Sequence, residues 1–254
     1  MTSSHLRFFA ASAVALLVSA MGVAAEPAII AKARARLGPE SVIEAVKSIH
    51  YVGTLVTTDP TDPTKQTRAA IDIVFQKNDQ QRIRATSDKI IETTALDSYD
   101  AWQRKQDAAD QSKWQQTLLG PAQIKRLRAN TWETLAFFRG IEKRGGKIEE
   151  MGTATVDGVV CQKVAFIHAP DIIFYRHFDP ATGRLVYTET ETGGTLREQG
   201  EIMAGGLRFP KTLVTTTKNA KDQVQTVTIN IEKVTVNEVF PASFFAVPGL
   251  GTKK

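Results

Sequence analysis

The segment Tyr175-Arg-His-Phe-Asp-Pro-Ala-Thr-Gly-Arg-Leu-Val-Tyr-Thr-Glu189 has the pattern of two β-strands joined by a turn. In the central turn Pro180 presets one backbone angle and Gly183 is free to take a positive φ. Two later segments continue the pattern, Gly205-Gly-Leu-Arg-Phe-Pro-Lys-Thr-Leu213 and Val236-Asn-Glu-Val-Phe-Pro-Ala-Ser-Phe-Phe-Ala-Val-Pro248. Short strands separated by turn residues about every ten positions predict an antiparallel meander. Such a sheet curves, and its concave side has to be filled.

Alternating apolar and polar residues predict strands along most of the chain. The expected strands are Tyr51–Thr58, Ala69–Phe75, Arg82–Ala85, Ile90–Thr94, Tyr99–Arg104, Ile148–Gly152, Thr153–Val156, Val159–Ile167, Ile172–Phe178, Leu185–Glu191, Leu196–Met203, Lys211–Lys218 and Val224–Val236. The polar stretch Gln106–Lys113 has no clear period and is expected to be a loop.

Apolar residues at helical spacing predict an N-terminal helix over Ala28–Leu37. Gly38 interrupts it. Pro39 suits the first turn of a second helical stretch, expected to continue to Ile49, because its missing N–H costs nothing there. This amphipathic unit is expected to lie across the sheet.

Residues 121–140 predict two further short helices. The first begins at Pro121, and Asn130-Thr131 has the pattern of a stop followed by a new N-cap. The second helix carries Trp132 and a Phe137-Phe138 pair, which is much apolar surface for a short element. The segment either docks simply on the core or forms a mobile lid over an apolar cavity, and the sequence leaves both interpretations open.

The first 25 residues have the pattern of a cleaved secretory signal. Arg7 provides a positive start, Phe8–Val23 is apolar but too short to span a membrane, and Ala24-Ala25 supplies small residues for cleavage. We expect cleavage after about Ala25 and export to the periplasm. This leaves one domain over residues 26–254. No cysteine follows the apolar stretch, so lipidation is not expected.

Composition argues against several classes of function. The net charge is +5 and the basic residues are scattered, so no nucleic-acid partner is expected. Cys161 is the one cysteine, which excludes an internal disulfide and leaves a thiol or zinc centre without partners. The histidines show no metal-ligand spacing. We expect neither a cofactor nor a metal.

Candidate catalytic residues are few. Glu189 and Glu191 are compatible with a glycosidase pair, but on alternating strand positions they are expected to face solvent together. His177, beside Arg176, is expected at the surface or rim rather than as a base. No hydrolase elbow and no phosphate-binding loop is present. A hydrolase is therefore the least favoured hypothesis, and no catalytic residue is assigned.

Several motifs carry a resemblance to a known superfamily. They are Tyr51-Val-Gly-Thr-Leu55, Arg82-Ile-Arg84, Leu96-Asp-Ser-Tyr-Asp-Ala-Trp102, Val156-Asp-Gly158, Phe178-Asp-Pro-Ala-Thr-Gly-Arg-Leu185, Gly206-Leu-Arg-Phe-Pro210 and Phe244-Phe-Ala-Val-Pro248. In this order the chain resembles the outer-membrane lipoprotein-sorting superfamily of LolA-, LolB- and RseB-like proteins. The resemblance covers nearly the whole mature chain.

The resemblance implies an α+β fold: an unclosed antiparallel β half-barrel of roughly ten or eleven strands, with about three helices covering its concave side. Family carriers take acylated lipoproteins from an inner-membrane transporter and pass them to an outer-membrane acceptor. Because no lipidation cysteine is present, the chain is similar to the soluble carrier, which implies a monomer that binds an acyl chain or another lipid-like ligand without catalysis. The alternative is an RseB-like module that senses lipids.

The chain departs from the carriers at the lid. Carriers use an arginine near the first hairpins to hold the lid by hydrogen bonds. Here the nearest positions are Gln76-Lys77, followed by Arg82. Because lysine cannot form the planar fork of a guanidinium, the way in which this lid is held is open.

A cavity that takes an acyl chain gains roughly 0.8 kcal/mol for each buried CH₂. The residues expected to line such a cavity and its lid are Ile71, Ile73, Phe75, Ile83, Ile91, Trp102, Trp132, Leu135, Phe138, Phe166, Phe174 and Leu213. Alternation shows which of them share a face of a strand. It does not show whether that face lines a cavity or belongs to the core.

Overall fold

The computed structural model describes residues 26–62, 64–218 and 222–249, so the predicted signal sequence lies outside the described residues. The strands in the described part of the chain are β1 Ser48–Thr58, β2 Gln66–Gln76, β3 Gln80–Thr86, β4 Ile90–Asp97, β5 Asp100–Asp107, β6 Trp114–Leu118, β7 Lys147–Val156, β8 Val159–Ala169, β9 Ile172–Phe178, β10 Leu185–Thr190, β11 Thr195–Gln199, β12 Ile202–Ala204, β13 Leu207–Phe209, β14 Thr212–Lys218 and β15 Val224–Val236.

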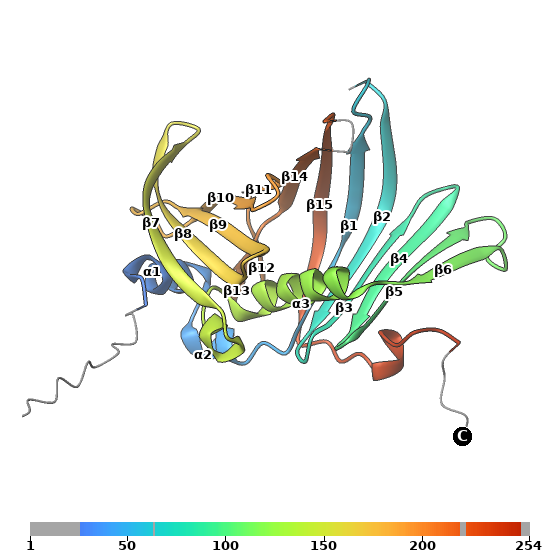
Figure 1. Cartoon of the computed structure of the whole chain (residues 1–254), viewed down its shortest axis with the longest axis horizontal. Helices are drawn as coiled ribbons and strands as arrows, with labels where there is room; N and C mark the ends of the chain where they lie inside the picture. The colour runs from blue at the N-terminus through green and yellow to red at the C-terminus, as the bar shows by residue number, and fades with distance from the viewer. Residues whose placement is uncertain (1–25, 63, 219–221, 250–254) are drawn as a thin grey trace, which may run out of the picture.

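Thirteen strands form one antiparallel sheet in the order β6-β5-β4-β3-β2-β1-β15-β14-β11-β10-β9-β8-β7. The two end strands, β6 and β7, do not pair with each other, so the sheet stays unclosed. Figure 1 shows β1–β6 on one side and β7–β10 on the other, with β14 and β15 between them. Strands β12 and β13 form a separate hairpin. The predicted α+β fold with an unclosed antiparallel sheet is confirmed.

The sheet has more strands than the roughly ten or eleven expected from turn spacing. Trp114–Leu118 was not predicted as a strand, and it pairs with β5 as the edge strand β6. The expected strand Leu196–Met203 is instead divided, because the chain leaves the sheet after Gln199 and enters the β12–β13 hairpin. Residues 148–156 form one strand, β7, with a bulge in the middle rather than two strands.

The turn between β9 and β10 has the chemistry that its sequence predicts. The Asp179 carboxylate accepts hydrogen bonds from the backbone N–H of Ala181 and the hydroxyl of Thr182. Gly183 takes a φ of 75°, and a Cβ there would lie 2.7 Å from the backbone of Lys32. Glycine is required both by the left-handed backbone and by the close approach of the N-terminal helix.

Three α-helices lie in the described residues: α1 Ala28–Leu37, α2 Glu40–Glu44 and α3 Pro121–Ala136. Helix α2 is shorter than expected, because Ile49 already belongs to β1, where Ile49 and Tyr51 alternate inward with the period of a strand. Two short 3₁₀ helices, η1 Ile141–Arg144 and η2 Ala242–Phe244, complete the helical elements. None of the described helices is long and apolar enough to span a lipid bilayer.

The predicted break at Asn130-Thr131 is wrong, because α3 runs through both residues. The Thr131 hydroxyl lies 2.9 Å from the Leu127 carbonyl, and the Thr134 hydroxyl donates to the Asn130 carbonyl at 3.0 Å. These hydroxyl groups bond back to the preceding turn instead of capping a new helix. The helix ends at Phe137, which has a left-handed backbone.

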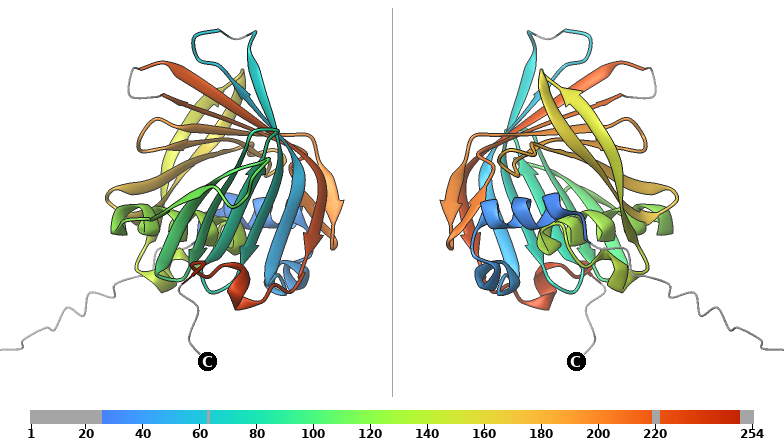
Figure 2. Two further views of the ribbon diagram at one scale, coloured as in Figure 1. Left: turned by 90° about the vertical axis from the view of Figure 1, so that its right-hand side faces the viewer. Right: turned by 90° about the vertical axis from the view of Figure 1, so that its left-hand side faces the viewer.

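The two faces of the sheet are covered by different parts of the chain. Helix α3 lies across the concave face, where Tyr51, Ile73 and Ile83 share one row of the strand register. The C-terminal tail with η2 covers the opposite face, where the Trp102 indole N–H donates to the Phe245 carbonyl at 2.9 Å. Figure 2 shows α3 and η2 in these positions.

Candidate functional site

Helix α3 is attached to the turn between β2 and β3 by an ionic network. Arg128 of α3 and Arg144 of η1 both contact the carboxylate of Asp79, with nitrogen–oxygen distances of 2.8 Å and 2.6 Å. Burial alone would raise the pKa of Asp79, but the hydrogen bonds from Arg144 and Arg128 outweigh it and hold this pKa below its usual value. One turn further along α3, the Thr131 hydroxyl lies 3.0 Å from the side-chain oxygen of buried Gln81.

The C-terminal end of α3 is held by an arginine of α1. Nη1 of Arg34 donates to the carbonyl oxygens of Ala136 and Phe137 at 3.0 Å and 2.7 Å. The same guanidinium pairs with Glu40, and this hydrogen bond lowers the pKa of the carboxyl. Arg34 therefore supplies the charged group that satisfies the open C-terminal end of α3.

The sequence analysis expected an arginine that holds this helix near the first hairpins, and it did not identify Arg34. A signal was available in the helical spacing. Arg34 shares the stripe of Ile30, Ala33 and Leu37, which packs inward, so the sequence places a charged residue on the buried face of α1. A buried guanidinium requires hydrogen-bond acceptors or a counter-ion. On the packed face of a helix, these groups come from the neighbouring element.

A cavity of about 490 Å³ lies between α3 and the concave face of strands β9, β10, β11 and β14. Its lining residues are Arg126, Asn130, Glu133, Thr134, Phe174, Arg176, Leu185, Thr188, Thr190, Thr192, Gly194, Thr195, Leu196, Glu198, Thr215 and Thr217. Strand register explains much of this set. Arg176, Thr188, Leu196 and Thr215 form one row across four neighbouring strands and point to the same face.

Arg176 is the central charged group of this cavity. It is 8% exposed, and its guanidinium lies 4.8 Å from the ring centres of both Phe138 and Phe166. Its Nη1 is 2.7 Å from the carboxylate of Glu133 on α3, and the other carboxylate oxygen of Glu133 lies 2.6 Å from His168. The sheet and α3 thus meet through buried charges beside the cavity.

Glu198 stands beside the cavity without a side-chain hydrogen bond or ion pair within the described residues. Burial raises the pKa of its carboxyl to about 7, although the nearby Arg176 opposes the shift. Near neutral pH this group therefore exchanges a proton, with both forms populated.

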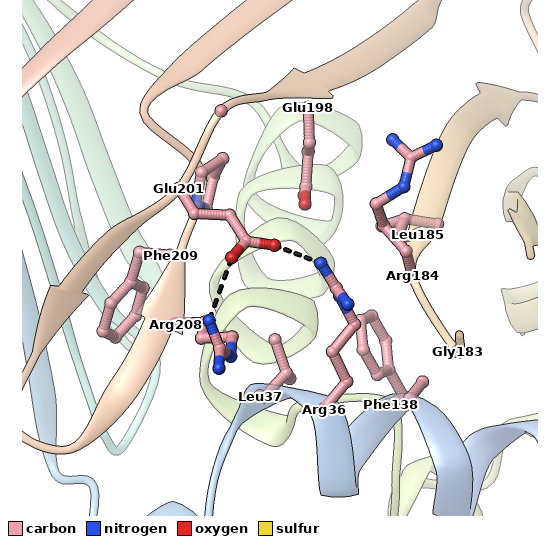
Figure 3. A pocket seen from close by; sticks show the side chains of 13 residues that line it. Arg36, Leu37, Phe138, Gly183, Arg184, Leu185, Glu198, Glu201, Arg208 and Phe209 are labelled. Atoms are coloured by element: carbon pink, nitrogen blue, oxygen red, sulfur yellow. Dashed lines mark hydrogen bonds and ion pairs between the residues drawn. The ribbon is translucent and has the colours of Figure 1, made fainter.

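A second, smaller cavity of about 180 Å³ lies on the other side of Glu198 and Leu185, which line both spaces. Figure 3 shows Glu198 above this space, with Phe138 and Leu37 below it. At its rim Glu201 pairs with Arg36 of α1 and with Arg208 of β13. The two cavities are thus separated by one leucine and one unpaired carboxyl group.

The structure divides the twelve predicted lining residues among several environments. Phe174 lines the 490 Å³ cavity, and Phe138 lines the 180 Å³ cavity. Trp132 and Leu135 line a third space of about 390 Å³, on the side of α3 toward the β2–β3 turn. Phe166 is fully buried beside Phe138.

Five predicted residues pack on the concave face in one apolar cluster that contains Leu135: Ile71, Ile73, Phe75, Ile83 and Leu213. None of these five residues lines one of the three cavities described above. On this part of the concave face these side chains pack against one another and against Leu135 of α3. The open space lies toward the strands that follow α3 in sequence.

The last two predicted residues face the other side of the sheet. Trp102 pairs with Ala95, and Ile91 has the same strand parity as Ala95, so all three share a face. Ile83 pairs with Thr94 and therefore points to the opposite face. Ile91 and Trp102 do not face the concave side, because the tail at Phe245 covers their face.

His177 also departs from its expected surface position. It is 2% exposed, and it packs against Tyr187 with a ring-centre distance of 5.5 Å. Burial lowers the pKa of His177 below its ordinary value. Its neighbour Arg176 points into the cavity, so alternation places His177 on the opposite face of β9. In the described part of the chain no cluster of three or more His, Cys, Asp or Glu residues is arranged to hold a metal ion.

Comparison with known proteins relates the chain to others through its fold. No sequence profile of a known family matches it, and neither does any curated protein sequence. A DUF1329 family protein from Desulfovibrio piger superposes with a TM-score of 0.54 at 7% identity, over 86% of this chain and 96% of that one. An outer membrane lipoprotein-sorting protein domain from Vibrio parahaemolyticus gives 0.52 at 8% identity, over 85% and 95%.

A LolA superfamily protein from Nitrosomonas europaea also gives a TM-score of 0.52, at 10% identity, over 83% of this chain and 98% of that chain. These identities are low, and the similarity is one of fold. The resemblance seen in the sequence is confirmed at this level, since the structural neighbours belong to the lipoprotein-sorting superfamily.

Proposed function

We propose that the protein is a non-catalytic periplasmic binding protein or carrier for an amphipathic, lipid-like ligand. The observation that carries the proposal is the 490 Å³ cavity between α3 and the concave face of an unclosed sheet. Its size falls within the range of about 300–1,000 Å³ usual for small-molecule sites. The similarity of fold to lipoprotein-sorting proteins supports the same assignment.

The energetics of the cavity suit reversible binding. Phe174, Leu185 and Leu196 provide an apolar wall, and each ligand CH₂ placed against it gains roughly 0.8 kcal/mol. Helix α3 packs on the core through Ala129 and Leu135. In this proposal the ligand enters beside the helix, whose polar contacts include those at Asp79, Gln81, Arg34 and Arg176. Such contacts can exchange with water when the helix moves, so uptake and release need no nucleotide.

The arrangement of titratable groups supports a role without catalysis. His168 and Arg176 are both held by Glu133, and His177 faces away from the cavity. Glu198 is the one carboxyl group at the cavity without an ion pair in the described residues, and no second carboxyl or base is paired with it. In this proposal these groups bind and orient the ligand and do not transfer protons to it.

The proposal is tested by measuring what the purified protein binds. Native mass spectrometry and lipid extraction of protein taken from the periplasm should find an apolar or amphipathic ligand, and the emptied protein should take up a dansyl-labelled fatty acid. Leu196→Trp, which fills the cavity, should weaken this uptake at least tenfold. The control is Leu118→Trp on the exposed edge strand β6, which should leave uptake unchanged. No co-purified lipid together with no uptake by the wild type would reject the proposal.

The finer role proposed is transport of acylated lipoproteins from an inner-membrane transporter to an outer-membrane acceptor, by a monomer. Glu26, rather than a cysteine, follows the expected cleavage site, which supports a carrier that is not lipidated at this position. Mass spectrometry of the complexes isolated from cells tests this step. An acylated protein as cargo is expected, whereas free lipid as the sole cargo would contradict transport of lipoproteins and retain lipid binding.

A further inference from the structure

We propose that the 490 Å³ cavity binds the polar head of its ligand beside the Arg176–Glu133 ion pair, and that this head is uncharged and carries hydroxyl groups, as a glycerol or sugar moiety does. The inference rests on the proposed function and specifies the chemical class of its ligand. It follows from the buried polar atoms at this cavity that make no hydrogen bond in the described residues.

Two buried side chains bring unused hydrogen-bonding capacity to the cavity. Arg176 is 8% exposed and Glu133 is 5% exposed, and both line the space. Within the described residues Nε and Nη1 of Arg176 and Oε2 of Glu133 have no hydrogen-bond partner. Nη1 and Oε2 are 2.7 Å apart, so the charges attract, but the two groups are not aligned as donor and acceptor. Buried polar atoms left in this state are costly, which favours a ligand that completes them.

The unused atoms are of both kinds. The guanidinium of Arg176 can only donate, and the carboxylate oxygen of Glu133 can only accept. A hydroxyl group donates and accepts at once, so one hydroxyl that lies beside the pair can accept from Arg176 and donate to Glu133. A carboxylate or a phosphate offers acceptors alone, and an ammonium offers donors alone. Neither charged class matches both sides of the pair.

The sheet wall of the cavity extends the same chemistry beyond Arg176. Thr188 of β10 and Thr215 of β14 lie on either side of Leu196 in one row of the strand register, beginning at Arg176. Thr217 lies two positions further along β14 on the same face and also lines the cavity. In the described chain the hydroxyl groups of these three threonines make no hydrogen bond. They offer further donors and acceptors to a head with several hydroxyl groups, while their methyl groups keep the wall compatible with hydrocarbon.

The charges around the cavity disfavour an anionic head. Arg126 at its edge is paired with Glu191, so its charge is already balanced. Glu198 lines the same wall and is partly ionised near neutral pH. An anionic head beside Arg176 would lie close to the carboxylate of Glu133 and to the ionised form of Glu198. Arg176 would then be the one cation left to balance these negative charges, and like charges in such surroundings repel strongly.

The rest of the cavity has room for the start of an apolar chain. Phe174, Leu185 and Leu196 line it, and the 180 Å³ space begins beyond Leu185 and Glu198. The geometry thus places the hydroxylated head near α3 and Arg176, with the adjoining hydrocarbon along the leucines.

The test compares three probes with the same twelve-carbon chain: monododecanoyl glycerol, dodecyl glucoside and dodecanoic acid. Their affinities for the full-length mature protein are measured at pH 8 by displacement of a dansyl-labelled fatty acid. We expect the glycerol or the glucose head to improve affinity at least tenfold over the free acid. Equal or tighter binding of the acid would overturn the inference while leaving the proposed function intact. Binding of none of the probes, nor of the dansyl fatty acid, would overturn both.

Substitutions then locate the head. Thr188→Val and Thr215→Val keep side-chain shape and remove one hydroxyl each, so the fold is retained and the preference for the hydroxylated probes should fall about threefold or more for each. Thr54→Val, on β1, is the matched control. It should leave the preference unchanged. Arg176→Lys should reduce it further, provided that circular dichroism shows a folded protein. An unchanged preference in both threonine variants would refute the assignment of this wall.

Discussion

Arg34 of α1 donates a hydrogen bond of 2.7 Å to the carbonyl oxygen of Phe137, the residue at which α3 ends. This contact joins two segments that are far apart in sequence, and Arg34 is 3% exposed. The C-terminal end of α3 is thus attached to α1 inside the protein, which leads to a direct prediction about how firmly α3 is held.

Arg34→Ala should lower the free energy of unfolding by about 3 kcal/mol, because it leaves two carbonyl oxygens without their charged donor and Glu40 with Arg139 as its remaining partner. Hydrogen exchange of the last turns of α3 should also accelerate. Arg36→Ala is the control on the same helix. Arg36 pairs with Glu201 at the surface, so its loss should cost less than about 1 kcal/mol. Equal effects of the two substitutions would contradict a special role for Arg34.

Asp79→Asn should destabilise the protein by about 1–2 kcal/mol at pH 7, because Arg128 and Arg144 both lose an ionised partner. Asparagine tolerates the φ of 59° at this position, so the turn itself is preserved. The native pKa of Asp79 is lowered, so its stabilisation is complete above the unfolded-state pKa and is lost as pH falls through the native value.

Urea unfolding curves should therefore converge for the wild type and Asp79→Asn as the pH falls below about 4. Asp100→Asn, an exposed carboxylate at the following turn, serves as the control and should change stability by less than about 0.5 kcal/mol. A difference between wild type and Asp79→Asn that stays constant down to acid pH would show that the charge is not what matters.

Glu198 should make the protein less stable as the pH rises. Its native pKa of about 7 lies above the ordinary value of 4.5, so the native state binds more protons than the unfolded state between these values. Stability attributable to this group is full below about pH 4.5 and falls up to about pH 7. Glu198→Gln, which stays uncharged, should remove this slope and gain on the order of 2 kcal/mol at pH 8. A slope that persists in the variant would assign it to another group.

Trp102→Phe should leave ligand uptake unchanged within about twofold, because Trp102 faces the tail rather than the concave side. The lost hydrogen bond to Phe245 should cost about 1 kcal/mol of stability. Phe174→Ala should instead weaken uptake of the dansyl fatty acid by about tenfold, since Phe174 lines the cavity. If Trp102→Phe is fully folded and its uptake is reduced, the ligand does not bind on the concave side of the sheet.

Much of the fold can be predicted from the sequence because its strands alternate and its turns carry diagnostic residues. Asp179 and Gly183 adopt the conformations that their side chains favour. Strand β6 is harder to predict, since Trp114–Leu118 is largely polar and exposed at an edge. The continuity of α3 depends on Thr131, whose hydroxyl finds Leu127 and Gln81 only once the helix is packed.

The site was less predictable because alternation assigns residues to one of two faces without stating which face is open. Ile90 and Ile91 are both apolar, so β4 gives no sign of its inward face. Arg176 and Glu133 are of residue types that are usually exposed to solvent. They can be buried here because they form an ion pair between β9 and α3. An arginine between Phe174 and Phe178 on an inward-facing strand is a signal that can be sought in other sequences.

The two end strands of the sheet, β6 and β7, do not pair with each other. This open edge affects which ligands the protein can accommodate. In a closed barrel, strand number and stagger fix the diameter. An unclosed sheet carries no such condition, so small changes in twist between neighbouring strands alter the distance between its two wings while every ladder hydrogen bond is retained. The width of the concave space can therefore change, so that one fold can bind ligands of different thickness.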